Sequence, residues 1–348
     1  MRTINVGIIG AGGIFPNHAE ALRAIERTQG TCRANLVALC DLDLDLAHKR
    51  AAEYGIPTVT NDWRDLIARP VDALFILTPP SAHREPAVAA LGAGIHVFCE
   101  KPLAHTLADG RAILDAARAS KAVCQVGFNN LFEPATRQMW RMSARGECGR
   151  LVRAYDRHTV FRASTSWTDP KRRDRWRLDQ AASGGRMQEF GSHKVNWLVA
   201  VGGKVRTVVG RADSVAEALA ERGVDDVNLL LADFERGGVG TVEVSLVPTT
   251  WNAWSVGIQG AEAGVEWPGG KTLLVRRKDA EKTEEIPVES VPETRQAHFF
   301  RWITEIGDPA QCPTPEVTAE AAYHVLEVCL AFLESARTGA MQRIGQPS

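Results

Sequence analysis

The stretch Val6-Gly7-Ile8-Ile9-Gly10-Ala11-Gly12-Gly13-Ile14-Phe15 decides the fold of the first part of the chain. A short apolar run ends in closely spaced glycines, and apolar residues then recur at helical spacing, which predicts a strand, a tight turn and a helix. Gly10 permits the sharp turn, and Gly12, which has no Cβ, lets the backbone approach a pyrophosphate at the helix N-terminus. Phe15 stands where Gly or Ala usually gives close helix–strand packing, so this packing must be arranged differently. An ordinary turn between a strand and a helix shows the same glycine spacing.

The composition is that of an ordinary globular protein. The 348 residues suggest about two domains, and 45% of them are hydrophobic and 24% charged. The net charge of -1 gives no reason to expect nucleic acid or an acidic membrane as a partner. The seven cysteines form no CxxC pair, which disfavours a disulfide framework or a structural zinc site and fits a reducing compartment. With no signal-peptide pattern and no apolar run of roughly 18 residues, the sequence predicts a soluble, cytoplasmic protein without a bound metal.

Strand-like and helix-like segments alternate up to residue 126, which predicts right-handed βαβ units and a parallel sheet. After the first strand, we expect strands at 36–41, 71–77, 95–99 and 122–126, and a helix at 107–119. Ligands bind beyond the carboxyl ends of such strands. Asp41, Thr78 and Lys101 come at those ends, so we expect one cleft to gather them.

Asp41 ends the second strand, and its carboxylate is suited to accept both hydroxyls of an adenosine ribose and to repel a 2′-phosphate. No Arg or Lys follows before Lys49, which favours NAD over NADP. The distance from the glycines exceeds the usual roughly 20 residues, and the polar insert at 28–35 explains the difference. The alternative is that Asp41 only caps the helix that begins near Leu44.

Beyond residue 127 the pattern changes to alternating strands with few helices between them, which predicts an α+β domain on a largely antiparallel sheet. Strands are expected at 150–161, 205–209, 227–234, 240–246, 255–259 and 272–275, and helices at 135–145, 187–201, 296–306 and 315–335. No repeat or low-complexity linker separates the two parts. We therefore expect one domain over 1–126 and a second over 127–348.

Glu100-Lys101-Pro102 follows a predicted strand. The residue before a proline is kept out of the helical region, which fixes where Lys101 points. At the nicotinamide end of a cofactor, Lys101 is able to hydrogen-bond a hydroxyl or carbonyl oxygen of a substrate. The alternative is a surface turn with a solvated ion pair.

Glu189-Phe190-Gly191-Ser192-His193 places a carboxylate and an imidazole four residues apart, on one face of a predicted helix. The carboxylate fixes the tautomer of the imidazole and raises its basicity, which suits a general base that removes a hydroxyl proton. A Glu–His pair on a helix is also common as a mere surface contact.

Trp176 and Arg177 precede Ser183-Gly184-Gly185. An indole and a guanidinium bind a polar ring by stacking and hydrogen bonds, and the glycines allow close approach. The neighbouring basic run at 171–175 is interpreted as a solvated or subunit-facing patch, since Asp169, Asp174 and Asp179 dilute its charge.

Together these segments resemble the Gfo/Idh/MocA family, the relatives of glucose–fructose oxidoreductase and inositol dehydrogenase, over essentially the whole chain. Glu100-Lys101-Pro102 is identical to the family signature, and Ser183-Gly184-Gly185 followed by Glu189-x-Gly191-x-His193 is similar to the segment that supplies its catalytic histidine. The other matching segments are Gly10-Ala11-Gly12-Gly13-Ile14, Asp41, Thr78-Pro79-Pro80-Ser81-Ala82-His83 and Gly127-Phe128-Asn129.

The resemblance implies a Rossmann domain and a second, substrate-binding domain whose open sheet packs against other subunits in homodimers or homotetramers. It implies NAD(P)-dependent oxidation of a hydroxyl on a sugar, polyol or similar ring. Lys101 and His193 would assist proton transfer, and Glu189 would hold or polarise the histidine. The implied cofactor contacts are Gly10, Gly12, Gly13, Ile14, Asp41, Thr78, Pro80, His83, Glu100 and Lys101, and the implied substrate contacts are Asn129, Trp176 and Arg177.

Three departures from the family pattern bear on the substrate class. Glu189 replaces the usual Asp, Asn130 and Leu131 stand where many members have Arg, and Arg186 follows two glycines rather than three. Two rival functions remain: a redox-neutral lyase or glycosidase that retains NAD, and a non-catalytic dinucleotide-binding sensor or scaffold. Stoichiometric NADH release separates the first rival from a dehydrogenase, and loss of activity in Lys101→Ala separates the second.

Overall fold

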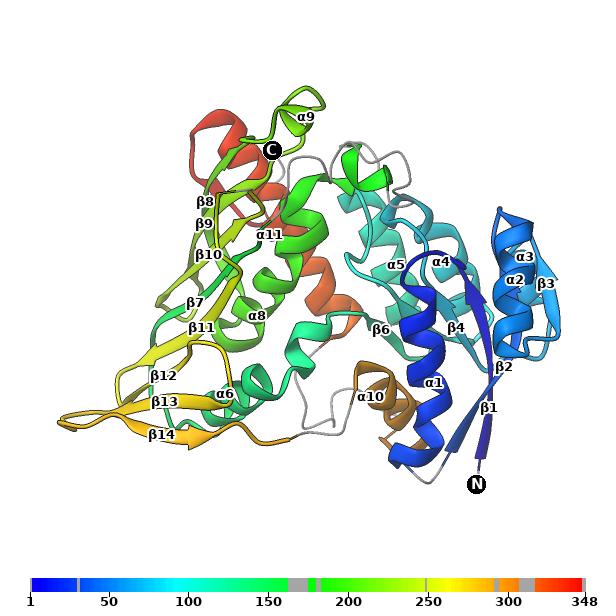
Figure 1. Cartoon of the computed structure of the whole chain (residues 1–348), viewed down its shortest axis with the longest axis horizontal. Coiled ribbons are helices and arrows are strands. Elements are labelled where there is room, and N and C mark those ends of the chain that lie inside the picture. Colours follow the sequence, from blue (N-terminus) through cyan, green and yellow to red (C-terminus); the bar gives the residue numbers. More distant parts are fainter. Residues whose placement is uncertain are drawn as a thin grey trace. The chain divides into compact units, whose positions relative to one another are not determined.

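The computed structural model describes residues 2–29, 32–161, 175–179, 183–247, 249–290, 294–306 and 317–345. Figure 1 shows the chain, which divides into two compact units, Met1–Phe128 with Pro292–Tyr323, and Asn129–Val291 with His324–Ser348. The predicted boundary after residue 126 falls two residues before the end of the first segment. The prediction places all residues after 126 in the second domain. The structure differs, because Pro292–Tyr323 groups with the first unit.

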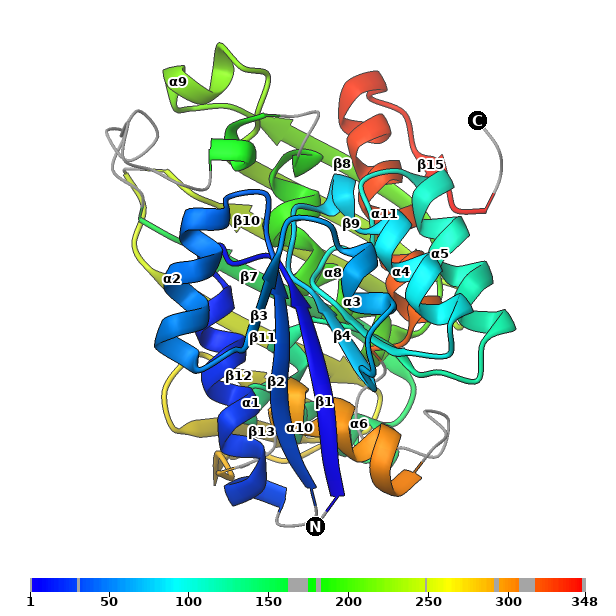
Figure 2. The ribbon, with the colours of Figure 1, turned by 90° about the vertical axis from the view of Figure 1, so that its right-hand side faces the viewer.

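The first unit is built on six strands in the order β3-β2-β1-β4-β5-β6, the order of doubly wound dinucleotide-binding sheets. The strands are β1 (Arg2–Ile9), β2 (Cys32–Cys40), β3 (Thr58–Thr60), β4 (Ala73–Ile76), β5 (His96–Cys99) and β6 (Cys124–Val126). Every pairing is parallel, as for β1 and β2, which run alongside each other in Figure 2. The predicted parallel sheet is therefore confirmed.

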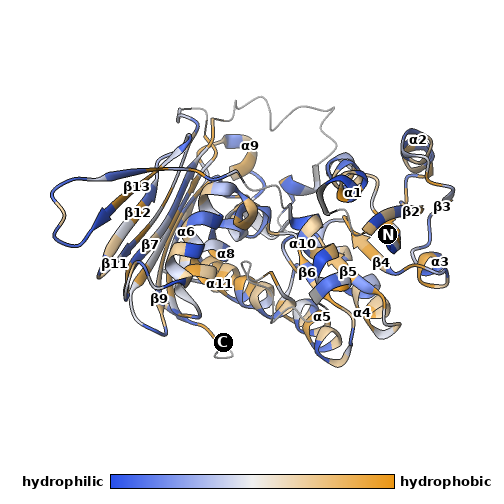
Figure 3. Cartoon of the chain, turned by 90° about the horizontal axis from the view of Figure 1, so that it is seen from below, coloured by the Kyte–Doolittle hydropathy of each residue, from blue (hydrophilic) through white to orange (hydrophobic). Residues whose placement is uncertain are grey.

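Helices cover both faces of this sheet. They are α1 (Phe15–Gln29), α2 (Leu44–Tyr54), α3 (Arg64–Ile67), α4 (Arg84–Gly92), α5 (Leu107–Ala119) and α10 (Arg295–Arg301). In Figure 3, α1 and α10 lie on one face and α4 and α5 on the other. The stacked rings of Phe75 and Phe98 both meet the edge of Phe299, at centroid distances of 5.6 and 5.7 Å. This aromatic core explains why α10 joins the first unit.

Phe15, at the third position of the glycine pattern, is fully buried. Its ring meets that of Tyr54 edge to face, with centroids 5.3 Å apart. The bulky side chain thus fills the space between α1 and α2. A small residue is therefore not needed at this position.

The second unit is built on nine strands in the order β14-β13-β12-β11-β7-β10-β9-β8-β15. They are β7 (Leu151–Thr159), β8 (Val205–Asp213), β9 (Val227–Phe234), β10 (Val239–Ser245), β11 (Ala253–Gly260), β12 (Ala263–Trp267), β13 (Thr272–Arg277), β14 (Glu284–Pro287) and β15 (Gln342–Arg343). Only the β7–β10 pair among these described pairings is parallel. The predicted, largely antiparallel sheet is confirmed, and β12, β14 and β15 are additional to the prediction.

The helices of the second unit are α6 (Pro134–Ala144), α8 (Ser192–Gly202), α9 (Glu217–Ala220) and the later part of α11 (Ala319–Thr338). Figure 3 shows α6, α8 and α11 on one face of the sheet, and no described helix covers the opposite face. The predicted helix at 187–201 is observed as a π-helical turn, η5 (Met187–Gly191), followed by α8. None of the helices in the described part of the chain is long and apolar enough to cross a membrane.

Candidate functional site

The glycine turn after β1 leaves open space at the start of α1. Gly10 has a φ of +104°, and a Cβ there would lie 2.9 Å from the carbonyl of Leu77, so a side chain does not fit. A Cβ at Gly12 or Gly13 would meet nothing within 4 Å. The space above these two glycines therefore fits the pyrophosphate of a dinucleotide at a helix N-terminus.

Asp41 lies beside this turn, as the sequence predicts. Its Oδ2 atom accepts the Ala11 N–H at 2.6 Å, and its Oδ1 atom accepts the Asp43 N–H at 2.9 Å. The Gly10 N–H donates to the carbonyl of Cys40 at 2.8 Å, which ties the turn to the end of β2. Each carboxylate oxygen has a further lone pair, so Asp41 is able to accept ribose hydroxyls while it holds the turn.

Thr78 and His83 belong to the segment after β4. The Thr78 Oγ1 atom is buried and has no hydrogen-bond partner among the described residues, which fits a polar group of a ligand. His83 is fully buried, with Nε2 at 2.9 Å from the Thr78 carbonyl and Nδ1 at 3.2 Å from the Leu103 carbonyl. Burial lowers the pKa of His83. Its ring thus links the segment after β4 to the segment after Lys101. Cofactor contacts of His83, and of Pro80 at the start of the adjoining 3₁₀ turn (Pro80–Ala82), stay predictions.

Lys101 leaves the sheet at the carboxyl end of β5, where the preceding Glu100 N–H donates to the carbonyl of Ile76 in β4 at 2.9 Å. The Lys101–Pro102 peptide bond is cis. Lys101 is partly exposed, whereas Glu100 is buried. The first unit therefore brings together the glycine turn, Asp41, Thr78 and Lys101 along the carboxyl ends of adjacent strands.

The Glu100 carboxylate has partners that the sequence analysis missed. Its Oε1 atom lies 2.8 Å from Nε2 of His18 and 3.1 Å from Nη2 of Arg295. His18 falls on the apolar face of the predicted first helix, next to Ala19, and a polar residue at such a position was a usable signal. Arg295 had none, because only the folded chain brings α10 to Glu100. A direct cofactor contact of Glu100 stays a prediction.

The second unit holds the remaining predicted residues. His193, in the first turn of α8, is buried, and Glu189 lies in η5. One oxygen of the Glu189 carboxylate is paired with Nη1 of Arg177, and the other lies 3.2 Å from Nη1 of Arg186. Glu189 lies in the π-helical turn and His193 in the α-helix that follows it, four residues later. The orienting role of Glu189 toward His193 stays a prediction.

Trp176 and Arg177 lie in a short 3₁₀ turn (Arg175–Leu178), with the guanidinium carbon of Arg177 at 5.1 Å from the Trp176 ring centroid. Gly184 has a φ of +72°, and a Cβ there would fall 2.0 Å from the Gln188 side chain. The structure thus brings Trp176, Arg177 and Glu189 together. Asn129 is exposed at the start of this unit, and residues 171–174 of the basic run lie outside the described residues.

A second buried cluster anchors α8 to the sheet. Lys194, the residue after His193, has its Nζ atom 3.7 Å from Oδ1 of Asp156 and 4.1 Å from the ring centroid of Trp254. The Trp254 Nε1–H also donates to Asp156 at 2.9 Å. Burial raises the pKa of Asp156 to about 6, against the opposing effect of Lys194. No sequence pattern indicates this cluster.

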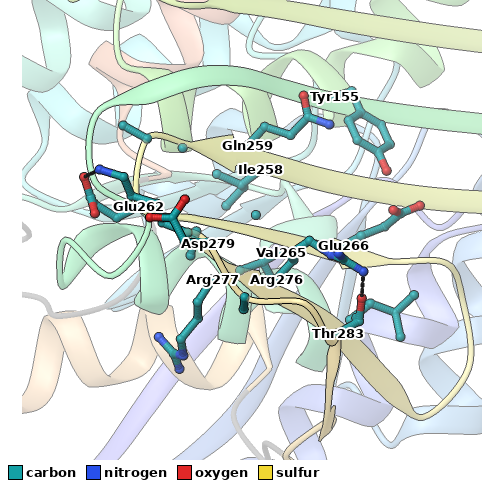
Figure 4. Close-up of a pocket in the computed structure, with 17 residues that line it drawn as sticks. Tyr155, Ile258, Gln259, Glu262, Val265, Glu266, Arg276, Arg277, Asp279 and Thr283 are labelled. Atoms are coloured by element: carbon teal, nitrogen blue, oxygen red, sulfur yellow. Dashed lines mark hydrogen bonds and ion pairs between the residues drawn. The ribbon is translucent and has the colours of Figure 1, made fainter.

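The helix-free face of the second sheet carries a hollow of about 550 Å³ over β11, β12 and β13, shown in Figure 4. Its charged lining includes Glu262, Glu266, Arg276, Arg277, Lys278 and Asp279. None of the predicted site residues lines it. Within the described residues, no group of three or more His, Cys, Asp or Glu side chains is placed to hold a metal ion.

Comparison with known proteins agrees with this geometry. Residues 4–128 match the model of the GFO/IDH/MocA oxidoreductase family with an NAD-binding Rossmann fold, and residues 136–266 match the GFO/IDH/MocA C-terminal domain. Together the two matches account for more than half of the chain.

Individual relatives resemble the chain over most of its length. A levoglucosan dehydrogenase from Pseudarthrobacter phenanthrenivorans is 29% identical over 70% of this chain and 68% of that protein. A 1,5-anhydro-D-fructose reductase from Ensifer adhaerens is 28% identical over 97% of this chain and 98% of that protein. A solved structure of levoglucosan dehydrogenase in complex with NADH has a TM-score of 0.87 at 23% identity, over 99% of this chain and 100% of that one, and shows the same fold.

Proposed function

The chain belongs to the GFO/IDH/MocA family of NAD-binding oxidoreductases, and from this premise we propose that it is a sugar or polyol dehydrogenase. In this proposal a hydride passes between a secondary hydroxyl of a sugar, polyol or related cyclic substrate and the nicotinamide. The names of the relatives, which act on levoglucosan and 1,5-anhydro-D-fructose, support this substrate class. The observation that carries the proposal is Lys101, which follows the carboxyl end of β5 in the same unit as the open glycine turn and Asp41.

The cofactor part of the proposal rests on the first unit. Gly10, Gly12, Gly13 and Ile14 hold the pyrophosphate, Asp41 binds the adenosine ribose, and Thr78 and Pro80 lie along the remaining cofactor. Asp41 repels a 2′-phosphate, so NAD is preferred to NADP by about tenfold or more, equivalent to roughly 1.4 kcal/mol. Bound NAD supplies the hydride acceptor.

The chain's own residues move the proton and hold the substrate. Lys101 donates a hydrogen bond to the reacting oxygen, and His193 accepts the hydroxyl proton as the alkoxide character develops. Glu189 holds or polarises the His193 imidazole. Asn129, Trp176 and Arg177 are assigned to substrate binding, where an indole and a guanidinium suit a polar ring.

The experiment is NADH formation at 340 nm with a panel of anhydrosugars, inositols, glycosides and sugar acids, with NAD and NADP in parallel and the products identified by mass spectrometry. Lys101→Ala and His193→Ala should each lower kcat by roughly 10²–10⁴-fold, because each removes a proton-transfer group. Lys49→Ala and His48→Ala, at exposed positions of α2, are the matched controls and should keep wild-type kcat.

The outcomes separate the alternatives. Steady NADH production that depends on Lys101 and His193 supports the dehydrogenase. Product formation without net NADH favours a redox-neutral enzyme that retains its cofactor, and NAD binding without any turnover favours a sensor. Equal affinities for NAD and NADP would contradict the role of Asp41.

The assembly is also part of the proposal. Leu229 and Leu231 of β9 are about half exposed on the helix-free face of the sheet, and exposed apolar side chains of this kind favour burial by a second subunit. We therefore assign this face to a homodimer or homotetramer, and sedimentation that finds only monomers at micromolar concentration would contradict it. The six described cysteines are buried and are not bonded to one another, which suits a reducing, cytoplasmic location that cell fractionation can test.

A further inference from the structure

The buried carboxylate of Glu100 joins three segments of the first unit. Its Oε1 atom contacts His18 of α1 at 2.8 Å and Arg295 of α10 at 3.1 Å. Its Oε2 atom accepts the backbone N–H of Lys101 at 3.1 Å. One carboxylate therefore links the first turn of α1, the first turn of α10 and Lys101, the residue that we assign to catalysis.

The protonation state of His18 follows from its neighbours. The Gln296 amide nitrogen lies 3.1 Å from Nδ1 of His18, and an amide NH₂ only donates, so Nδ1 accepts. Nε2 of His18 faces both the Glu100 carboxylate, at 2.8 Å, and Nη2 of Arg295, at 3.2 Å. Burial and the neighbouring Arg295 both lower the pKa of His18, in agreement with a neutral ring. The charged groups at the centre of the cluster are therefore Glu100 and Arg295.

Arg295 is held from a second side. Its Nη1 atom donates to the carbonyl of Gly127 at 2.8 Å, and its own carbonyl accepts from the Gln125 side chain at 2.9 Å. A Cβ at Gly127 would lie 3.0 Å from the Glu100 carboxylate, so the absence of a side chain there leaves room for the pair. These contacts fix the guanidinium, and through it the carboxylate, in one position.

The electrostatic environment of Glu100 is dominated by cations. Burial alone raises the pKa of Glu100, but Arg295, His18 and Lys101 outweigh burial and the pKa is lowered. The other titratable groups that feel its charge are His83 and Cys99. Glu100 is therefore ionised and adjoins Lys101, while Arg295 offsets part of its charge. Removal of the Glu100 charge makes the electrostatic potential at Lys101 more positive. Removal of the Arg295 charge makes it more negative.

We propose that Glu100 and Arg295 are positioning residues for Lys101, which hold its backbone and set the charge that its ammonium group experiences. The part that concerns catalysis rests on the proposed function, whereas the part that concerns the charge of Lys101 does not. Glu100 thus acts through Lys101. His18 contacts the Glu100 carboxylate and Gln296 contacts His18, so these two residues orient Glu100.

The test measures how readily Lys101 reacts with trace acetic anhydride across pH, quantified by peptide mass spectrometry and normalised to the exposed Lys49. Only the neutral amine reacts, so the midpoint of the labelling curve reports the charge of Lys101. Glu100→Gln removes a negative charge and should lower the midpoint by about 0.5–1 pH unit, and Arg295→Met should raise it by a similar amount. Arg84→Met, which breaks the surface ion pair with Asp109, is the control and should leave it unchanged.

Opposite shifts cannot come from loosened packing alone, which would move both variants alike. Arg295→Lys keeps the positive charge, so the labelling midpoint of Lys101 in this variant should lie close to the wild-type value. Midpoints that move in the same direction, or do not move in folded protein, would overturn the proposal. If Arg295→Met does not fold, an unchanged midpoint in Glu100→Gln overturns it.

Turnover supplies the second readout. In Glu100→Gln and Arg295→Met, kcat should fall roughly 10–100-fold, and the alkaline limb of the pH–rate profile should move as the labelling midpoint does. In Arg295→Met the KM for NAD should stay within about threefold of the wild-type value. The labelling needs no substrate. Opposite labelling shifts in a protein that oxidises nothing would therefore refute the proposed function and leave this assignment standing.

Discussion

Two glutamates, one in each unit, sit between pairs of basic side chains and shortly precede a residue assigned to catalysis in the sequence. Glu100 lies between His18 and Arg295 and precedes Lys101, and Glu189 lies between Arg177 and Arg186 and precedes His193 by four residues. The two sites differ in where their partners come from. Glu189 binds residues 12 and 3 positions away, whereas His18 is 82 positions from Glu100.

They also differ in exposure. The Arg295 side chain is 8% exposed and that of Arg177 is 34% exposed, whereas both carboxylates are buried, with Glu100 9% and Glu189 2% exposed. A pair made from distant segments inside the first unit ties the fold together, and a pair made from neighbouring segments shapes one local turn. The same chemical motif is therefore expected to contribute stability at Glu100 and local order at Glu189.

The largest expected difference is in the free energy of unfolding. Arg295→Met leaves the Glu100 carboxylate buried with its main cation removed, which should cost about 3–5 kcal/mol. Arg177→Met should cost about 1 kcal/mol, because the Arg177 side chain is one-third exposed and the buried Arg186 still neutralises Glu189. Urea denaturation followed by circular dichroism measures both, with Arg84→Met as a surface control. Equal losses in the two variants would remove the distinction between the sites.

The next difference is in how stability depends on pH. The pKa of Glu100 is lowered on folding, so its contribution is present above the unfolded value near 4.5 and is lost as the pH falls. The pKa of Asp156 in the second unit is raised from 3.8 to about 6 by burial, so its contribution is present at low pH and is lost as the pH rises from 4 to 6. The two buried carboxylates therefore change stability in opposite directions with pH.

Isosteric variants isolate these contributions. Wild-type protein should lose on the order of 2–3 kcal/mol between pH 4 and 6 through Asp156, and Asp156→Asn should remove that decline. The gap between wild type and Glu100→Gln should instead narrow below pH 4.5. Urea midpoints at half-unit pH steps give both curves. An Asp156→Asn protein whose stability falls between pH 4 and 6 as steeply as wild type would contradict the raised pKa.

The sequence was sufficient for the features that short-range patterns encode. The glycine turn, Asp41 at the end of β2 and Lys101 at the end of β5 follow from periodicity and strand order, because parallel strands must end at one edge of the sheet. The alternation of β9 and β10 likewise predicts strands of a largely antiparallel sheet. These are consequences of local propensity and chain direction.

What the sequence analysis missed depends on segments that meet only after folding. Nothing around Arg295 indicates that α10 packs on the first unit, since its aromatic contacts with Phe75 and Phe98 are not visible as a spacing. Lys194 falls in a predicted amphipathic helix, and its burial against Asp156 and Trp254 is decided by strands β7 and β11. The structure also has η5 and α8 where the sequence predicts one continuous helix. Hydrophobic spacing over so few residues does not distinguish a π-helical turn from an α-helical one.

The smallest effect concerns salt, and it separates the two glutamate sites without altering either carboxylate. The Debye length falls from about 10 Å at 0.1 M salt to about 3 Å at 1 M, and exposed pairs are screened far more than buried ones. Between 0.05 and 0.5 M NaCl, the cost of Arg177→Met should therefore shrink by a few tenths of a kcal/mol, as should that of Arg84→Met. The cost of Arg295→Met should change less, because both side chains of that pair are less than a tenth exposed. The comparison uses each variant's stability relative to wild type at the same salt concentration, so general effects of salt on unfolding cancel. A salt response as large in Arg295→Met as in Arg177→Met would show that the Glu100 cluster opens to solvent. The two sites would then differ only in how far apart in the sequence their ion-pair partners lie.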